Sequence, residues 1–129
     1  MDLSKVGAPT DREIELINPV DGELTGLFLT IAVSHDARVQ KNVRALRDKY
    51  IVEAAKASKG KAAKADTESQ EDRIFAAAHI VGCRWTGDAT WNGETPDYSI
   101  ELAYGLANQP FWRTQIVTEA YDVKAFYSA

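Results

Sequence analysis

Two segments near the N-terminus alternate between apolar and polar residues, and they constrain the fold more than any other feature of the sequence. In residues 13–18 two aliphatic side chains alternate with two glutamates, which is the period of a strand with one face in water. Residues 27–33 alternate in a more apolar way and predict a more buried strand. Asn18-Pro19 and Asp21-Gly22 lie between them and favour turns. We therefore predict a β-hairpin over residues 12–34. Because two strands alone are only marginally stable, a helix or a second copy must cover its apolar face.

A regular apolar stripe after the hairpin predicts a helix over residues 35–58. Its members recur every three or four residues and so share one helical face: Val39, Val43, Leu46, Tyr50 and Ala54. Ser34 can serve as the N-cap, and Asp36 suits the positive end of the helix dipole. Gly60 is placed to end the helix.

The charge of the chain is unevenly distributed, and its basic part coincides with this helix. The whole chain carries a net charge of −4, yet residues 38–64 contain nine basic and two acidic residues, a local balance of +7. Such a run usually faces water, but it can also steer an acidic partner toward the protein. We select Arg38, Lys41 and Arg44 as candidate partner-binding residues. Nucleic acid is a less favoured interpretation than a helix face in water, because charge runs usually face water.

The remaining sequence predicts a connection followed by a mainly helical C-terminal part over residues 70–129. Residues 59–69 lack a large apolar side chain and predict a linker or a frayed helix end. Residues 71–83 predict a helix. Ser99 caps a short helix that stops at Asn108, and Pro110 lies in the first turn of a last helix. The stripe expected on that last helix is Trp112, Ile116, Ala120, Val123 and Tyr127.

Together these elements predict an α+β fold, with an N-terminal β-hairpin followed by a mainly helical part of about four helices. With 129 residues, 45% of them hydrophobic, the chain matches one globular domain, which we place at residues 12–129. Residues 1–11 have few large apolar groups and predict a flexible arm. The single cysteine excludes an internal disulfide framework, and neither a signal peptide nor a membrane span is indicated. A reducing cytoplasm is the expected compartment.

No constellation of residues predicts a catalytic site, a metal or a cofactor. His79 and Cys83 stand four apart on a predicted helix, which could offer two zinc ligands on one face. Two ligands do not complete a site, and no base or oxyanion donor is indicated for Cys83 as a nucleophile. The glycines fit no phosphate-binding loop. Gly105 lies inside a predicted helix, where glycine costs about 1 kcal/mol relative to alanine, so it predicts a close neighbour. We therefore predict a non-enzymatic protein.

All three tryptophans lie between residue 84 and the C-terminus. Trp85 and Trp91 belong to a predicted loop, and Trp112 belongs to the last predicted helix. Stacking on bases is disfavoured, because the surrounding acidic residues oppose a phosphate backbone. We expect the tryptophans to hold the loop on the core or to contact a protein partner. With Phe111 and Phe126 they complete the candidate partner-binding set.

The C-terminal stretch resembles the tail assembly chaperones of long-tailed bacteriophages. The residues that carry the resemblance are Trp85-x-Gly87, Asn92-Gly93-Glu94, Pro96-x-Tyr98-Ser99, Leu102, Leu106, Pro110-Phe111-Trp112-x-x-Gln115-Ile116, Asp122 and Phe126. Upstream, Asn18-Pro-Val-Asp-Gly22 followed by Leu-Thr-Gly-Leu and a strand is similar to the opening of the same small phage proteins. The resemblance covers residues 12–126, but Trp91 is not part of its pattern.

The resemblance implies a non-enzymatic role in the host cytoplasm during infection. Such proteins bind the tape measure protein and recruit tail tube subunits, are often expressed with a longer frameshifted product, and are usually absent from the finished particle. Two alternatives stay open. One is a structural virion component, such as a connector or minor tail protein. The other is a small phage-encoded inhibitor or regulator of host nucleic-acid machinery. Self-association is also compatible with the sequence.

Overall fold

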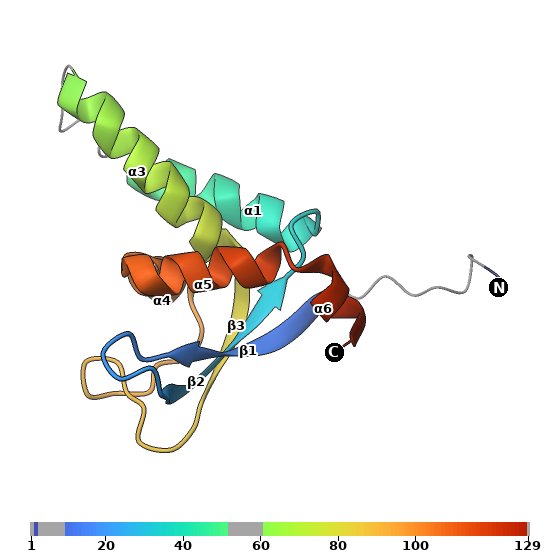
Figure 1. Cartoon of the computed structure of the whole chain (residues 1–129). Helices are drawn as coiled ribbons and strands as arrows, with labels where there is room; N and C mark the ends of the chain where they lie inside the picture. The colour runs from blue at the N-terminus through green and yellow to red at the C-terminus, as the bar shows by residue number, and fades with distance from the viewer. Residues whose placement is uncertain (1, 3–9, 52–60, 129) are drawn as a thin grey trace.

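The structure, a computed structural model, describes residue 2 and residues 10–51 and 61–128. It contains a three-stranded antiparallel sheet in the order β1-β2-β3, with helices packed on the sheet (Figure 1). The elements are β1 (Asp11–Ile17), β2 (Leu24–Ala32), α1 (Ala37–Leu46), η2 (Arg47–Ile51), α3 (Lys61–Ala78), β3 (Ile80–Trp85), α4 (Ile100–Ala107), α5 (Pro110–Ala120) and α6 (Val123–Ser128). The predicted α+β class, an N-terminal hairpin followed by mainly helical segments, is confirmed.

The predicted hairpin is present as β1 and β2. Ile14 lies opposite Leu29 in the antiparallel ladder, and both side chains are buried. In the connection, the Asn18 side-chain oxygen accepts a hydrogen bond from the Val20 backbone N–H at 2.9 Å. Gly22 has a φ of 74°, a left-handed conformation that glycine adopts without steric cost. The turn residues of the sequence therefore act as expected.

The helix predicted over residues 71–83 is wrong in its last five residues, 79–83. The helix ends at Ala78, and residues from Ile80 onward form β3, which pairs with β2 so that Cys83 lies opposite Leu29. The free edge of the hairpin supplies backbone partners that a helix cannot use, and the β-branched Ile80 and Val81 suit a strand. Helices thus cover the apolar face of the hairpin, and β3 covers one of its edges.

The connection predicted at residues 59–69 is also helical where it is described, since α3 begins at Lys61. Alanine and lysine, which dominate its first turns, are strong helix formers even without a large apolar side chain. This part of α3 extends beyond the sheet beside α1 (Figure 1). Residues 52–58, the end of the predicted basic helix, lie outside the described residues, as do residues 59 and 60 and most of the predicted arm at residues 1–11.

The basic helix begins later than predicted and changes from an α-helix to a π-helix. Its N-cap is Asp36, whose carboxylate accepts a hydrogen bond from the Arg38 backbone N–H at 2.8 Å. Ser34, the predicted cap, instead contacts His79. After Leu46 the helix continues as the π-helical segment η2, where Tyr50 stacks on Tyr104 of α4 with ring centroids 3.9 Å apart.

At the C-terminal end, α4 starts and stops where the sequence predicts, and α5 starts where it predicts. Ser99 caps α4 by accepting from the Leu102 N–H at 3.1 Å, Asn108 ends it, and Pro110 begins α5. The last helix is nevertheless broken after Ala120, because the chain turns at Tyr121 and restarts as α6. Val123 is therefore 60% exposed, although it belongs to the predicted stripe.

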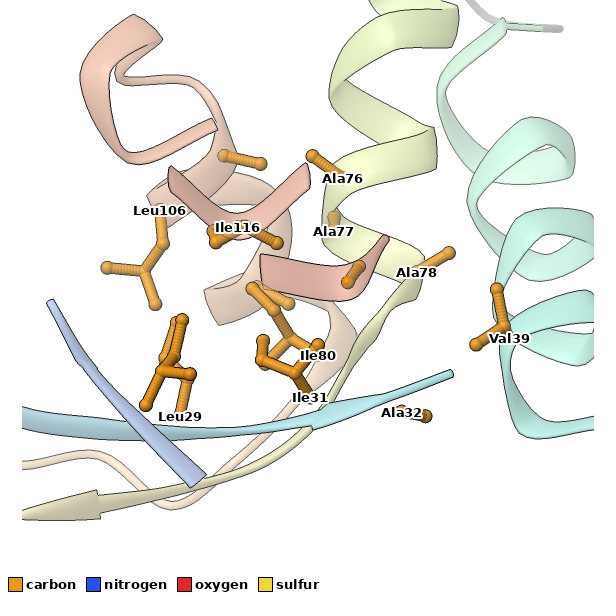
Figure 2. Close-up of a cluster of buried hydrophobic side chains, with 14 of the residues drawn as sticks. Leu29, Ile31, Ala32, Val39, Ala76, Ala77, Ala78, Ile80, Leu106 and Ile116 are labelled. Atoms are coloured by element: carbon orange, nitrogen blue, oxygen red, sulfur yellow. The ribbon is translucent and has the colours of Figure 1, made fainter. Parts of the chain in front are cut away.

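The core lies between the sheet and the helices (Figure 2). Leu29, Ile31 and Ile80 point from the sheet toward Leu106 and Ile116 of α4 and α5. The buried face of α3 contributes Ile74 and then, at its C-terminal end, three small residues, Ala76, Ala77 and Ala78. Small side chains allow close approach between backbones, which lets α3 pack against both α1 and α4.

Among the residues that the structure describes, no helix is both long and apolar enough to cross a lipid bilayer.

Candidate functional site: a tryptophan-lined hollow

The fold gathers the three tryptophans around one open hollow of about 380 Å³, which we call the tryptophan hollow. It lies where the β1–β2 connection and the segment after β3 come to the same end of the sheet (Figure 1). Its apolar lining consists of Leu16, Leu24, Leu27, Trp85, Ala89, Trp91, Leu106 and Trp112. Its polar lining consists of Asn18, Asp21, Glu23, Thr25, Asp88 and Thr90. Residues far apart in the sequence thus form a single surface.

Trp85 and Trp112 are held by hydrogen bonds from their indole nitrogens. Trp85 is the last residue of β3, and its Nε1–H donates to the Pro96 carbonyl at 2.7 Å. Trp112 lies in the first turn of α5, and its Nε1–H donates to the Ile17 carbonyl at 2.7 Å. Because both donors are used within the chain, these indoles offer apolar surface to the hollow.

Trp91 is positioned by a tight turn and by a glycine. Its backbone pairs with Glu94 around Asn92 and Gly93, which both have positive φ, 52° and 81°. An Asn-Gly pair with this geometry is typical of a type I′ hairpin turn. The ring lies against α4, where a Cβ added to Gly105 would be 3.3 Å from the Trp91 Cζ2 atom. The close neighbour predicted for Gly105 is therefore Trp91.

The segment that carries Trp91 is fixed at both of its ends. At its start, the Thr86 backbone N–H and hydroxyl both donate to the Gly26 carbonyl, at 2.8 Å and 2.7 Å. At its end, the Tyr98 hydroxyl donates to the Ile80 carbonyl at 2.7 Å. A binding surface that is held in this way loses less conformational entropy when a partner docks.

The electrostatic character of the hollow is acidic. Asp21, Glu23 and Asp88 lie along it, and no lysine, arginine or histidine is among its described lining residues. The Asp21 carboxylate accepts from the Glu23 backbone N–H at 2.9 Å, which holds the turn. Apolar surface continues at the hairpin tip, where Leu24 is 63% and Val20 is 92% exposed. The arrangement suits an apolar group that carries positive charge.

The structure does not bring the basic candidates to the hollow. Arg38 lies on α1, where its guanidinium contacts Asp36 at 3.0 Å and Asp11 at 3.3 Å. Hydrogen bonding to the Arg38 side chain is the main cause that lowers the pKa of Asp36. Lys41 and Arg44 are exposed and form no ion pair within the described part of the chain.

Other basic residues of this region also pair within the chain. Arg47 of η2 contacts Glu71 of α3 at 2.9 Å, and Lys49 contacts Glu101 of α4 at 2.7 Å. Three basic residues of the 38–64 segment, Arg38, Arg47 and Lys49, are thus offset in space by nearby carboxylates. Long-range attraction of an acidic partner is correspondingly weaker than the sequence alone suggests.

The two phenylalanine candidates have different environments. Phe111, at the start of α5, is 45% exposed and available to a partner. Phe126 is 2% exposed and belongs to the core, with the Arg12 guanidinium 5.4 Å from its ring centroid. In this structure Phe126 stabilises the fold and offers no surface to a partner.

His79 and Cys83 do not share a helical face, because one follows α3 and the other lies in β3. His79 is fully buried; its Nδ1 is 2.7 Å from the Phe75 carbonyl and its Nε2 is 3.2 Å from the Ser34 hydroxyl. Burial lowers the pKa of His79. Within the described residues no group of three or more potential metal ligands occurs.

Sequence reasoning missed the contribution of the hairpin to this site. Asp21 was assigned only to a turn, and Glu23 and Leu24 only to the hairpin as a whole, yet all three line the tryptophan hollow. One signal in the sequence could have indicated this: Leu24 follows Asp21 and Glu23 and stands outside the alternating pattern of residues 27–33.

Comparisons with protein-family models, curated proteins and solved structures give no match to this chain.

Proposed function

We propose that this chain is a non-enzymatic tail assembly chaperone of a long-tailed bacteriophage. In this role it binds the tape measure protein and tail tube subunits in the host cytoplasm during virion assembly. The phage setting rests on the resemblance of residues 12–126 to that family. The role as a binding module is supported by one structural observation, the tryptophan hollow.

The hollow has the composition of a protein-binding site. Tryptophan is enriched among the residues that dominate binding energy at interfaces, and such residues lie in apolar pockets surrounded by a polar rim. Here three tryptophans and four leucines share a hollow with carboxylates at its side. Its open form would admit side chains from an extended or helical segment of another protein.

The regulator of nucleic-acid machinery is less well supported. A surface for nucleic acid needs unpaired lysine and arginine, because phosphate contacts supply most of the affinity. On α1 and η2, Arg38, Arg47 and Lys49 contact carboxylates of this chain, which, within the described residues, leaves only Lys41 and Arg44 unpaired among the basic residues of these two elements. The acidic tryptophan hollow would repel a phosphate backbone.

The proposal is tested by co-expressing the tagged chain with the phage tail proteins and identifying captured proteins by mass spectrometry. Purified virions are analysed in the same way. We expect the tape measure or tube proteins in the captured fraction and this chain to be missing from virions. Abundance of the chain in virions would instead identify a structural component, and capture dominated by host proteins or nucleic acid would identify a regulator.

A matched pair of variants tests whether capture of the partner protein depends on the tryptophan hollow. Leu24→Ser removes an exposed apolar side chain that lines the hollow, and Val123→Ser removes one of similar exposure, 60%, on α6. Neither side chain is part of the core, so both variants should fold. We expect Leu24→Ser to reduce capture of the partner several-fold and Val123→Ser to leave it unchanged.

A further inference from the structure

We infer that the tryptophan hollow binds a protein segment in which a large apolar side chain is flanked by lysine or arginine. The inference rests on the proposed function in one respect only, that the hollow is a site for another protein. It adds the chemistry of the segment that the site selects.

The tryptophan rings that line the hollow favour binding of an apolar side chain from the partner. Trp85 and Trp112 use their only polar atoms on the Pro96 and Ile17 carbonyls, so their rings can offer an incoming group only apolar and π contacts. The Trp91 ring lies against Gly105. A volume of about 380 Å³ accommodates a few side chains but not a whole helix, which is about 10–12 Å across.

The charged residues that line the hollow favour a partner with lysine or arginine beside its apolar side chain. All charged residues among the described lining are carboxylates: Asp21, Glu23 and Asp88. Glu23 and Asp88 are exposed, and in the described part of the chain their carboxylates form neither a side-chain hydrogen bond nor an ion pair. Unpaired carboxylates beside an apolar surface favour a partner with the opposite charge and disfavour an acidic one. The faces of the half-buried indoles that line the hollow also attract lysine and arginine.

The occupant is a segment of a protein rather than a small molecule, because the apolar surface extends past the hollow. Leu24 is 63% exposed and lines the hollow, and Val20 on the same turn is 92% exposed. A small ligand would leave this surface in water. A segment that continues over the hairpin tip would cover it.

The test is a titration of the full-length ¹⁵N-labelled chain with three synthetic 15-residue peptides, followed through the tryptophan indole N–H signals. The first peptide has leucine and phenylalanine at its centre and lysine on both sides. In the second, glutamate replaces lysine. In the third, lysine is kept and serine replaces the apolar residues. We expect the first peptide to shift the indole signals to saturation and the other two to bind at least tenfold more weakly.

Charge-neutralising variants complete the test. The double variant Glu23→Gln with Asp88→Asn should weaken binding of the first peptide about threefold to tenfold, as expected for the loss of exposed charge pairs. Asp72→Asn, which removes an exposed carboxylate of α3 outside the hollow, should leave binding unchanged. Added salt should reduce the difference between the parent chain and the double variant, because salt screens exposed charges.

Three results would overturn the inference. One is equal binding of the lysine and glutamate peptides. Another is a shift confined to signals away from the three indoles. The third is an indole shift that depends only on protein concentration, which would make a second copy the occupant.

Failure of the inference and failure of the proposed function remain distinguishable. Selective peptide binding without capture of tail proteins supports the inference and removes only the phage role. Capture of the tape measure protein equally well by the double variant overturns the inference and leaves the chaperone role intact.

Discussion

At the scale of single residues, the site depends on a glycine whose role is visible only through its neighbour. Gly105 lies inside α4, and a Cβ there would come to 3.3 Å from the Trp91 ring. The absence of a side chain therefore lets Trp91 approach the helix. Glycine at position 105 lowers the stability of α4 but makes room for the Trp91 ring.

A double-mutant cycle tests this coupling. Alanine is more favourable than glycine in a helix by about 1 kcal/mol, so Gly105→Ala should stabilise the chain by nearly that amount when Trp91 is already alanine. In the parent chain the gain should be smaller, because the ring must move by a few tenths of an ångström. Denaturant unfolding of the four proteins measures the difference. Equal gains in both backgrounds would show that the two residues do not interact.

His79 is the buried polar residue that connects the end of α3 to the segment after β2. The Phe75 carbonyl can only accept, so Nδ1 carries the hydrogen, and Nε2 accepts from the Ser34 hydroxyl. In this neutral form both ring nitrogens have partners. Protonation would place a charge at a position from which water is excluded.

The stability of the chain should therefore fall in mildly acidic solution. The folded pKa of His79 lies below its ordinary value of 6.5, so the unfolded chain binds the proton more readily. Its contribution is complete above about pH 6.5 and is lost as the pH falls below that value toward the folded pKa. Unfolding free energies at several pH values measure the effect, with His79→Gln as the control that should lack this component. An identical pH dependence in that variant would contradict the assignment.

At the scale of elements, the side chain of Gln115 forms two of the hydrogen bonds that attach α5 to β1. The Gln115 amide nitrogen donates to the Glu15 carbonyl at 3.0 Å, and its oxygen accepts from the Ile17 N–H at 3.2 Å. These bonds fall where the β1–β2 register shifts between Glu15 and Ile17. The side chain thus gives one carbonyl and one N–H of the β1 backbone a partner on α5.

Gln115→Ala should destabilise the chain by about 1–3 kcal/mol, because two partly buried backbone groups lose their partners. Thr114→Ala, at an exposed position of the same helix, should change stability by less than about 0.5 kcal/mol. Thermal or denaturant unfolding measures both. A Gln115→Ala variant as stable as the parent would mean that water replaces the side chain at no cost.

At the scale of the whole molecule, the tryptophan hollow and the C-terminal helix lie at opposite ends of the sheet (Figure 1). Phe126 of α6 packs against the core beside Arg12 of β1, whose guanidinium also pairs with Glu119. The last helix therefore closes the molecule onto its first strand. This end supports the fold and leaves the other end free for binding.

Truncation of neighbouring aromatic residues in α6 should separate these roles. Phe126→Ala removes a ring that is 2% exposed and should cost about 3–5 kcal/mol. Tyr127→Ala removes a ring that is 57% exposed and should cost less than about 0.5 kcal/mol. Chemical denaturation of both variants provides the comparison. Similar small losses would place Phe126 outside the core.

Local patterns in the sequence determined the hairpin, the start of α5, both ends of α4 and the buried stripe of α1. Each depends on a few neighbouring residues, such as the alternation in β1, the cap at Ser99 or the proline at Pro110. The close neighbour of Gly105 was predictable for the same reason, since glycine inside a helix carries a local cost.

Tertiary structure alone decided the rest. Residues 80–85 form a strand because β2 offers an open edge, and no local pattern contains that edge. Phe126 is buried and Val123 exposed because the chain turns at Tyr121 and redirects α6. The site is nonlocal for the same reason: Leu24, Trp91 and Trp112 share a surface only after the sheet and helices have packed. A sequence displays the spacing of residues along the chain, whereas burial, pairing and the sign of the charge around a hollow depend on which distant residues meet.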